Sequence, residues 1–136
     1  TPPMNFMDGV FEYKNQQLAV RTAAGIVLPL TEEKMKNALE RADVAGKSVV
    51  VGVRPEHMHV LKDGEEAAAF ITGEVDVYEM LGSEAIAYVR QPGNKELIIA
   101  KIDADASMRP GDTVRLAFDL DKIHIFDKLT GQTITN

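Results

Sequence analysis

The sequence contains no cysteine among its 136 residues, which excludes disulfide bonds and thiol chemistry. Aromatic residues make up only 6% of the chain, and no basic cluster accompanies them. Sites for single-stranded nucleic acid combine aromatic platforms with a basic groove, so we expect no nucleic-acid partner. The longest apolar runs, such as residues 67–71, are far shorter than the roughly 20 residues of a membrane-spanning helix. Any membrane association is therefore expected to come through a partner protein.

Catalytic motifs are also missing from the sequence. It contains no Gly-x-x-x-x-Gly-Lys-Ser/Thr loop for the phosphates of ATP, and no serine stands in a Gly-x-Ser-x-Gly turn. His57 and His59 are spaced to share one face of a strand, and with His124 they would supply three ligands of a metal site. Nothing in the sequence brings His124 to that pair, so hydrogen-bonded histidines are favoured. We expect no enzyme activity, metal or cofactor in this chain.

Composition favours an ordinary folded domain. Hydrophobic residues make up 45% of the chain, which excludes a disordered tail. The formal net charge of -6 favours solubility and suits phosphate backbones poorly. The length fits one domain, or two small subdomains that share a core.

Short alternating segments dominate the chain. After the turn residues 110–112, Val114, Leu116 and Phe118 alternate with more polar neighbours, which is typical of a half-buried strand. Ile123 and Ile125 repeat the alternation. Further strands are predicted at residues 9–14, 17–22, 26–30, 47–54, 69–80, 85–90 and 96–101. Short strands separated by Gly, Pro and Asp turns indicate a mainly β fold, a barrel or a sandwich.

Two elements carry specific predictions about which side chains are buried. In the long strand, we expect Ile71, Gly73, Val75 and Val77 to face one way. One helix is expected after the N-cap Thr31, because Glu32 and Glu33 suit the first turn. Its apolar stripe is predicted to contain Met35, Ala38, Leu39 and Ala42, with Met35 and Leu39 packed against a sheet.

Four motifs occur in order along almost the whole chain. They are residues 2–7 (Pro-Pro-Met-Asn-Phe-Met), 52–57 (Gly-Val-Arg-Pro-Glu-His), 81–84 (Leu-Gly-Ser-Glu), and Gly111-Asp112 with 123–126 (Ile-His-Ile-Phe). Together they resemble the C-terminal regulatory segment, the transport-associated OB domain, of ATP-binding subunits of carbohydrate ABC importers. The similarity is to the maltose and multiple-sugar type. It implies an oligonucleotide/oligosaccharide-binding (OB)-like β-barrel with one short helix.

The resemblance also implies a function and a domain division. Residues 1–7 would be a linker from an ATPase domain that this chain lacks, and residues 8–136 the regulatory domain. That domain would contain two interwoven subdomains, about 8–62 with the C-terminal strands and about 63–110. It would keep two ATPase subunits paired and offer a surface for regulatory proteins. ATP and Mg²⁺ would belong to the missing domain.

The implied partners are a second copy of the chain, the transporter's membrane subunits through the ATPase domain, and a cytoplasmic regulatory protein. The implied location is cytoplasmic, at the inner face of the cell membrane through the transporter complex. Interface candidates carried by the motifs are Arg54, Glu56, His57, Gly82, Ser83, Glu84, His124 and Phe126.

Two alternatives stay open. Arg54 and Glu56 also fit a structural role, in which charge-assisted hydrogen bonds fix the end of the preceding strand. A small-ligand or oxyanion site is the alternative function, since backbone N–H groups at Leu81, Gly82 and Ser83 with Lys101 would suit an anion.

Overall fold

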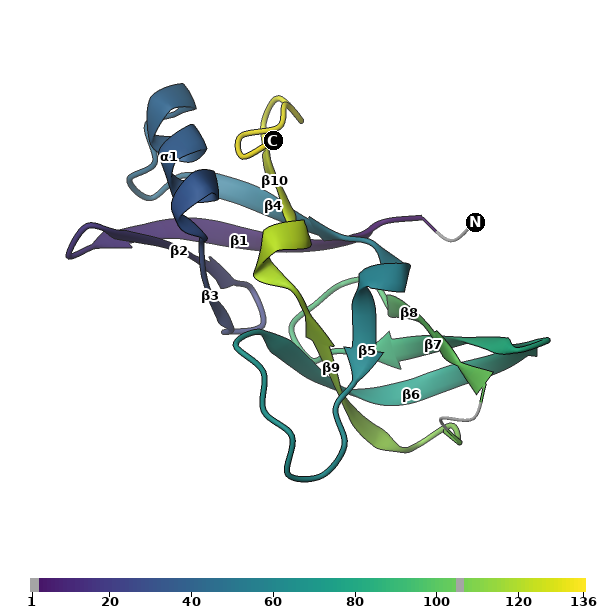
Figure 1. The fold of residues 1–136 in the computed structure, drawn as a ribbon. Coiled ribbons are helices and arrows are strands. Elements are labelled where there is room, and N and C mark those ends of the chain that lie inside the picture. The colour runs from purple at the N-terminus through teal and green to yellow at the C-terminus, as the bar shows by residue number, and fades with distance from the viewer. Residues whose placement is uncertain (1–2, 105–106) are drawn as a thin grey trace.

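Two five-stranded antiparallel sheets form the fold (Figure 1), which a computed structural model describes for residues 3–104 and 107–136. In neighbour order, sheet A contains β10 (His124–Asp127), β4 (Ser48–Val53), β1 (Asn5–Lys14), β2 (Gln17–Thr22) and β3 (Val27–Pro29). Sheet B contains β5 (Met58–Val60), β9 (Thr113–Phe118), β6 (Phe70–Leu81), β7 (Glu84–Arg90) and β8 (Ile98–Asp103). The helices described are α1 (Glu32–Arg41) and the 3-10 turns η1 (Pro55–His57) and η3 (Leu120–Lys122).

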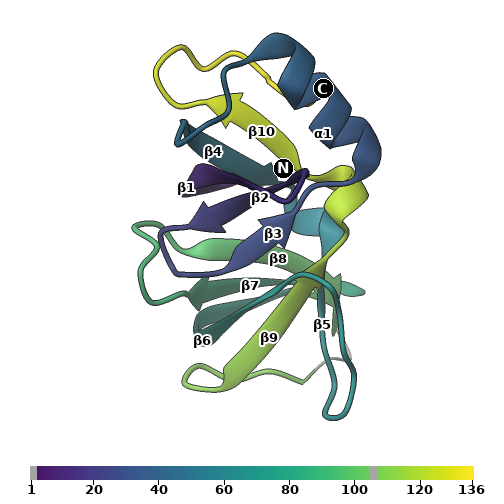
Figure 2. The same ribbon diagram turned by 90° about the vertical axis from the view of Figure 1, so that its left-hand side faces the viewer.

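The two sheets form stacked lobes, with α1 beside sheet A (Figure 2). The edge strands β5 and β8 of sheet B lie close to each other, so this sheet is a nearly closed barrel. The mainly β, OB-like fold with one helix is confirmed.

The chain crosses between the lobes twice. It leaves sheet A after β4, passes through η1 into β5, and returns from β9 through η3 to β10. β10 then pairs with β4, with Gly52 opposite His124. Sheet A is therefore built from both ends of the described chain, while sheet B is built from its middle.

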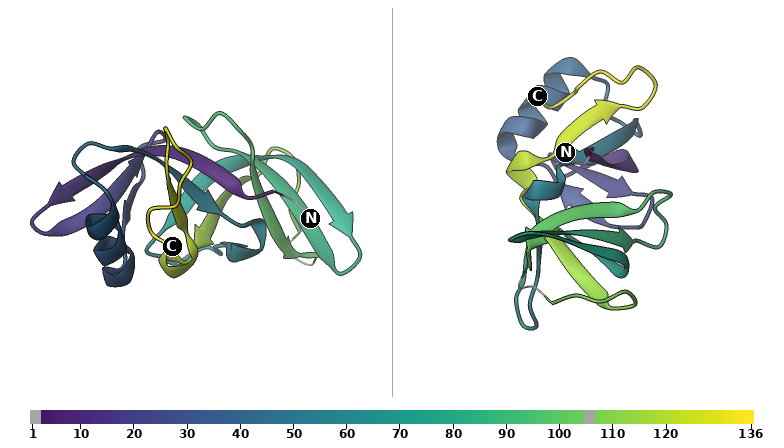
Figure 3. Two further views of the ribbon diagram at one scale, coloured as in Figure 1. Left: turned by 90° about the horizontal axis from the view of Figure 1, so that it is seen from above. Right: turned by 90° about the vertical axis from the view of Figure 1, so that its right-hand side faces the viewer.

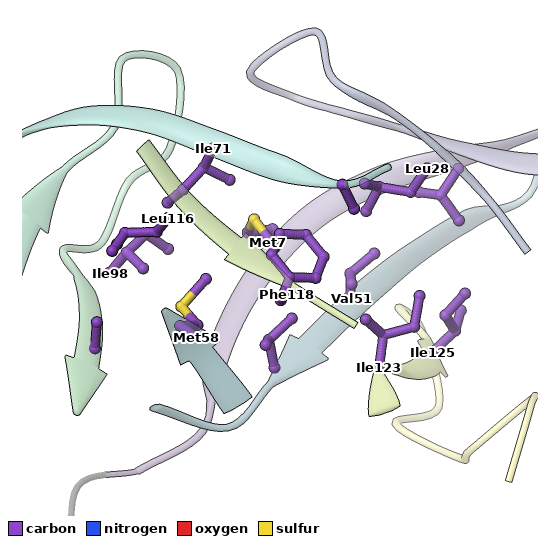
Figure 4. Packing of buried hydrophobic residues seen from close by; sticks show 14 of the residues in the cluster. Met7, Leu28, Val51, Met58, Ile71, Ile98, Leu116, Phe118, Ile123 and Ile125 are labelled. Atoms are coloured by element: carbon purple, nitrogen blue, oxygen red, sulfur yellow. The ribbon is translucent and has the colours of Figure 1, made fainter. Parts of the chain in front are cut away.

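A single hydrophobic cluster extends through both lobes (Figure 4). Met7 of β1 and Phe118 of β9 lie in its centre, with Leu28 and Ile125 toward sheet A and Ile98 toward sheet B. Because one cluster serves both sheets, each lobe supplies part of the other's apolar surroundings.

Residues 5–7, predicted to be the end of a linker, are the first residues of β1. Their side chains alternate, since Asn5 and Met7 are buried while Phe6 is exposed. Seen from above, the N-terminal end of β1 lies on the side of sheet B (Figure 3), where Asn5 is hydrogen-bonded to Ile99 of β8.

The predicted inward face of β6 holds for Ile71, Gly73 and Val75 but is wrong for Val77, which is 42% exposed. The register with β7 shifts between Val75 and Val77. A bulge adds one residue to the strand, so the alternation reverses after it.

The N-cap Thr31 is confirmed, since its Oγ1 accepts a hydrogen bond from the Lys34 backbone N–H at 3.3 Å. The predicted packing of Leu39 is wrong, because this side chain is 39% exposed and Lys34 and Ala38 are the buried residues of α1. The chain after β10 covers a different side of the helix from the one that the apolar stripe predicts. Arg41 donates to the backbone oxygen of Asn136 at 2.8 Å, and Asn37 to that of Thr135 at 3.0 Å.

Candidate functional site

The first group of predicted site residues lies where β4 ends. Pro55 has no N–H to continue the ladder, and it begins the single turn of η1. Arg54 and Glu56 are exposed on this turn, while His57 is half-buried. The Nδ1 of His57 is buried and has no hydrogen-bond partner within residues 3–104 and 107–136.

An aromatic surface lies on the outer face of sheet A, formed by Phe6, His124 and Phe126. The rings of His124 and Phe126 are stacked, with centroids 6.2 Å apart and planes at 16°. Phe6 meets Phe126 edge to face, also at 6.2 Å. A Cβ on Gly52 would approach Phe126 to 3.0 Å and collide with Met4, so glycine allows these side chains to lie flat on β4.

His124 connects the aromatic surface to the η1 turn. Burial lowers the pKa of its imidazole, and the positive charges of Lys34, Arg54 and His57 lower it further. Its Nδ1 is 2.9 Å from the amide nitrogen of Asn136. The fold therefore brings His124, Phe126, Arg54 and His57 into one region of the surface.

The second group lies at the tip of the β6–β7 hairpin. Gly82 adopts φ +69°, a left-handed conformation, and Leu81 pairs with Glu84 across the turn. Met80 and Leu81 are 58% and 57% exposed, which gives the tip an apolar surface. Glu84 forms an ion pair with Lys101 at 3.2 Å. The cation considered for an anion site therefore already has a carboxylate partner.

Glu56 and Glu84, which belong to separate motifs, line one cleft of about 580 Å³ beside β5 and β8. Lys62, Lys101 and Asp103 share its walls, so the cleft carries charges of both signs. The η1 turn and the hairpin thus line the same cleft, although the sequence gives no sign of it.

Two buried amide side chains were not among the predicted site residues. Asn5 is 4% exposed and Gln91 is 3% exposed. The burial of Asn5 could have been suspected from the sequence, because this polar residue interrupts the apolar run 4–7. Gln91 stands next to Pro92-Gly93 and looks like an ordinary turn residue in the sequence.

The described residues contain no cluster of three or more His, Cys, Asp or Glu side chains placed to hold a metal ion. Across the same part of the chain, no helix is both long enough and apolar enough to cross a membrane.

The antiparallel strands, the nearly closed sheet B and the single helix define the class of OB-type β-barrel domains. The chain matches the family model of the TOBE domain over residues 51–126 and that of the MalK OB fold domain over residues 1–58. It belongs to the TOBE domain family, and its relatives include ABC importer ATP-binding subunits.

Two relatives are similar to this chain over nearly its whole length. The oligosaccharides import ATP-binding protein MsmX of Bacillus subtilis is 35% identical over 134 residues, covering 96% of this chain and 34% of the relative. The trehalose/maltose import ATP-binding protein MalK of Thermococcus litoralis is 32% identical, covering 98% and 35%. The chain spans about a third of the length of these relatives.

A solved structure shares the fold. The cytoplasmic molybdate-binding protein ModG, in a form with molybdate bound, superposes with a TM-score of 0.71 over 89% of this chain and 94% of ModG. The sequence identity is 17%, so the likeness is one of fold.

Proposed function

We propose that this chain is the regulatory and dimerisation domain of the ATP-binding subunit of a carbohydrate or glycerol phosphate importer. The observation that carries the proposal is the match of nearly the whole chain to a third of such subunits. One of these relatives is an sn-glycerol-3-phosphate import ATP-binding protein from Chromohalobacter salexigens, 30% identical over 127 residues.

The physical role would be that of a tether. A persistent contact between two such domains holds their ATPase domains at high effective concentration. Each ATP cycle then closes a local gap and needs no new encounter between subunits. The domain would work at the inner face of the membrane, through ATPase domains that bind the membrane subunits.

Two exposed apolar regions support the proposed contact. One is the aromatic surface, where Phe6 is 52% exposed. The other is the hairpin tip with Met80 and Leu81. Exposed apolar side chains gathered in one place are typical of interaction sites. A regulatory protein that binds either region in only one state of the transporter would shift the population toward that state.

Light scattering of this chain over a concentration series tests the proposal. We expect a dimer that dissociates on dilution, and weaker association in Phe126→Ser or in Gly82→Trp with Glu84→Arg. Tyr13→Ser is the matched control, because Tyr13 is 45% exposed at the far end of β1. Two results together would refute the dimerisation role. This chain would stay a monomer at every concentration, and the same substitutions would leave the association of the complete ATP-binding subunit unchanged.

A further inference from the structure

A cleft of about 420 Å³ lies between the lobes, apart from the aromatic surface and from the hairpin tip. Ala24, Ile26 and Val27 line it from the sheet A side, and Phe70, Gln91 and Pro92 from the sheet B side. The two sides touch, because a Cβ on Gly93 would come within 2.9 Å of the Ala24 Cα. Every side chain that lines the cleft is uncharged.

Gln91 contributes an amide without a partner to this cleft. It is the first residue after β7 and is 3% exposed. Neither its Nε2 nor its Oε1 has a hydrogen-bond partner in the described parts of the chain. A buried amide without a partner loses its hydrogen bonds to water and gains none in return, so a ligand that pairs with it gains affinity.

The beginning of β6 supplies backbone groups to the same cleft. The β6–β7 ladder ends at the pair Glu74 and Arg90, and Pro92, two residues further, has no N–H. Ala69 and Val75 use their backbone groups on the β9 side. Because these directions alternate along a strand, the N–H and C=O of Phe70 and Thr72 point away from β9. On that side they have no backbone partner within residues 3–104 and 107–136.

We propose that this cleft binds a short, uncharged, extended peptide segment of a partner protein. Phe70 and Thr72 would pair with its backbone as one strand pairs with the next. The side-chain amide of Gln91 would pair with a peptide group on the side of the bound segment that faces Gln91.

The chain itself contains this kind of pairing. The Asn5 amide nitrogen donates to the Ile99 carbonyl at 2.8 Å, and the Ile99 N–H donates to the Asn5 side-chain oxygen at 2.7 Å. Gln91 carries the same functional group and lacks such a partner.

The chemistry of the walls selects against other ligands. An oxyanion would find no cationic side chain among the lining residues. A sugar would bury several hydroxyl groups against Ala, Ile, Val and Pro side chains, where only Gln91 and Thr72 offer polar side chains. A peptide with small apolar side chains leaves neither a charge nor a hydroxyl unpaired.

The experiment titrates the ¹⁵N-labelled chain with the capped tripeptide acetyl-Ala-Val-Ala-amide. Its extended length of about 10 Å matches three residues of a strand. We expect saturable shifts at the Phe70 and Thr72 N–H groups and at the Gln91 side-chain amide. Acetyl-Ala-Pro-Ala-amide lacks the central N–H and should bind about tenfold more weakly. Methyl glucoside, the sugar probe, should cause no saturable shift.

Two variants test whether the Gln91 amide itself contributes to tripeptide binding. Gln91→Leu should weaken tripeptide binding about fivefold, while its melting temperature stays equal or rises. Gln132→Leu, which changes an exposed glutamine, should bind as the wild type does. The proposal is overturned if wild-type shifts do not saturate by about 10 mM, if the proline peptide binds equally well, or if methyl glucoside alone binds. Unchanged affinity in Gln91→Leu would also overturn it. The wild-type peptide comparison decides the question even if Gln91→Leu fails to fold.

Discussion

Asn5 on β1 and Ile99 on β8 form a reciprocal pair of hydrogen bonds that joins the two sheets. The bonds are 2.8 and 2.7 Å long, and Asn5 is 4% exposed. A side-chain amide thus replaces a neighbouring strand at the free edge of β8. This contact fixes the first strand of sheet A against the last strand of sheet B.

Replacing Asn5 by Ala should lower the free energy of unfolding by about 2–4 kcal/mol. Both bonds are lost, and the Ile99 backbone groups are left without a partner. Urea denaturation measures the effect. In the control Asn94→Ala, an exposed bond to the Glu96 carbonyl is lost, and the cost should be about 0.5 kcal/mol. Equal losses in the two variants would show that Asn5 does not join the sheets energetically.

Gly73→Ala should destabilise the chain by about 2 kcal/mol or more. A Cβ there would lie 2.5 Å from Val89 Cγ1 and 2.6 Å from the Arg90 carbonyl oxygen, and backbone atoms yield little. Gly64 provides the contrast, because it adopts φ +85° in open space. Gly64→Ala should cost about 1 kcal/mol through backbone strain alone. In thermal unfolding, the melting temperature of Gly73→Ala should therefore lie clearly below that of Gly64→Ala.

The stability of the chain should fall as the pH decreases below the ordinary pKa of histidine. Because burial lowers the pKa of His124, the unfolded chain binds this proton at a pH where the folded chain does not. The free energy of unfolding therefore decreases as the pH falls from about 6.5 toward the lowered pKa of His124, and this contribution is then constant.

His124→Gln should flatten this dependence, measured by urea denaturation at several values between about pH 5 and 7. His59→Gln is the matched control, since His59 is exposed on β5. If the His124 variant kept the full slope, the dependence would have to come from other groups.

Molybdate, sulfate and phosphate should leave the melting temperature unchanged. A bound ligand would raise it by mass action, but Lys101 is already paired with Glu84. A concentration-dependent rise with molybdate that Lys101→Met abolishes would instead favour the alternative function, an oxyanion site near Gly82.

The sequence was sufficient to predict most of the fold. Period-two alternation located the strands, and Pro55 and Gly82 marked where chain direction changes. Val77 and Leu39 were misassigned for physical reasons. A bulge reverses the faces of β6 after Val75, and only the folded path of residues 134–136 shows which side of α1 is covered.

The grouping of the site residues could not be predicted in the same way. Local patterns place Arg54 at the end of a strand and His124 in a later one, but only the β4–β10 register brings them together. Glu56 and Glu84 line one cleft because β5 and β8 lie close together. Gln91 became visible only through its burial, which depends on contact between two turns far apart in the sequence.

The register of β4 with β10, Gly52 opposite His124, makes these two strands a β-hairpin whose connecting loop is the whole of sheet B. Sheet B is thus an insertion that leaves and re-enters sheet A at one edge. Its length or the tip of its hairpin can change without altering the strand pairing of sheet A. Conversely, removal of β10 would expose the edge of β4 while deleting no strand of the barrel. During synthesis, sheet A stays incomplete until β10 has been made. Sheet A is therefore completed only after all strands of sheet B have been synthesised.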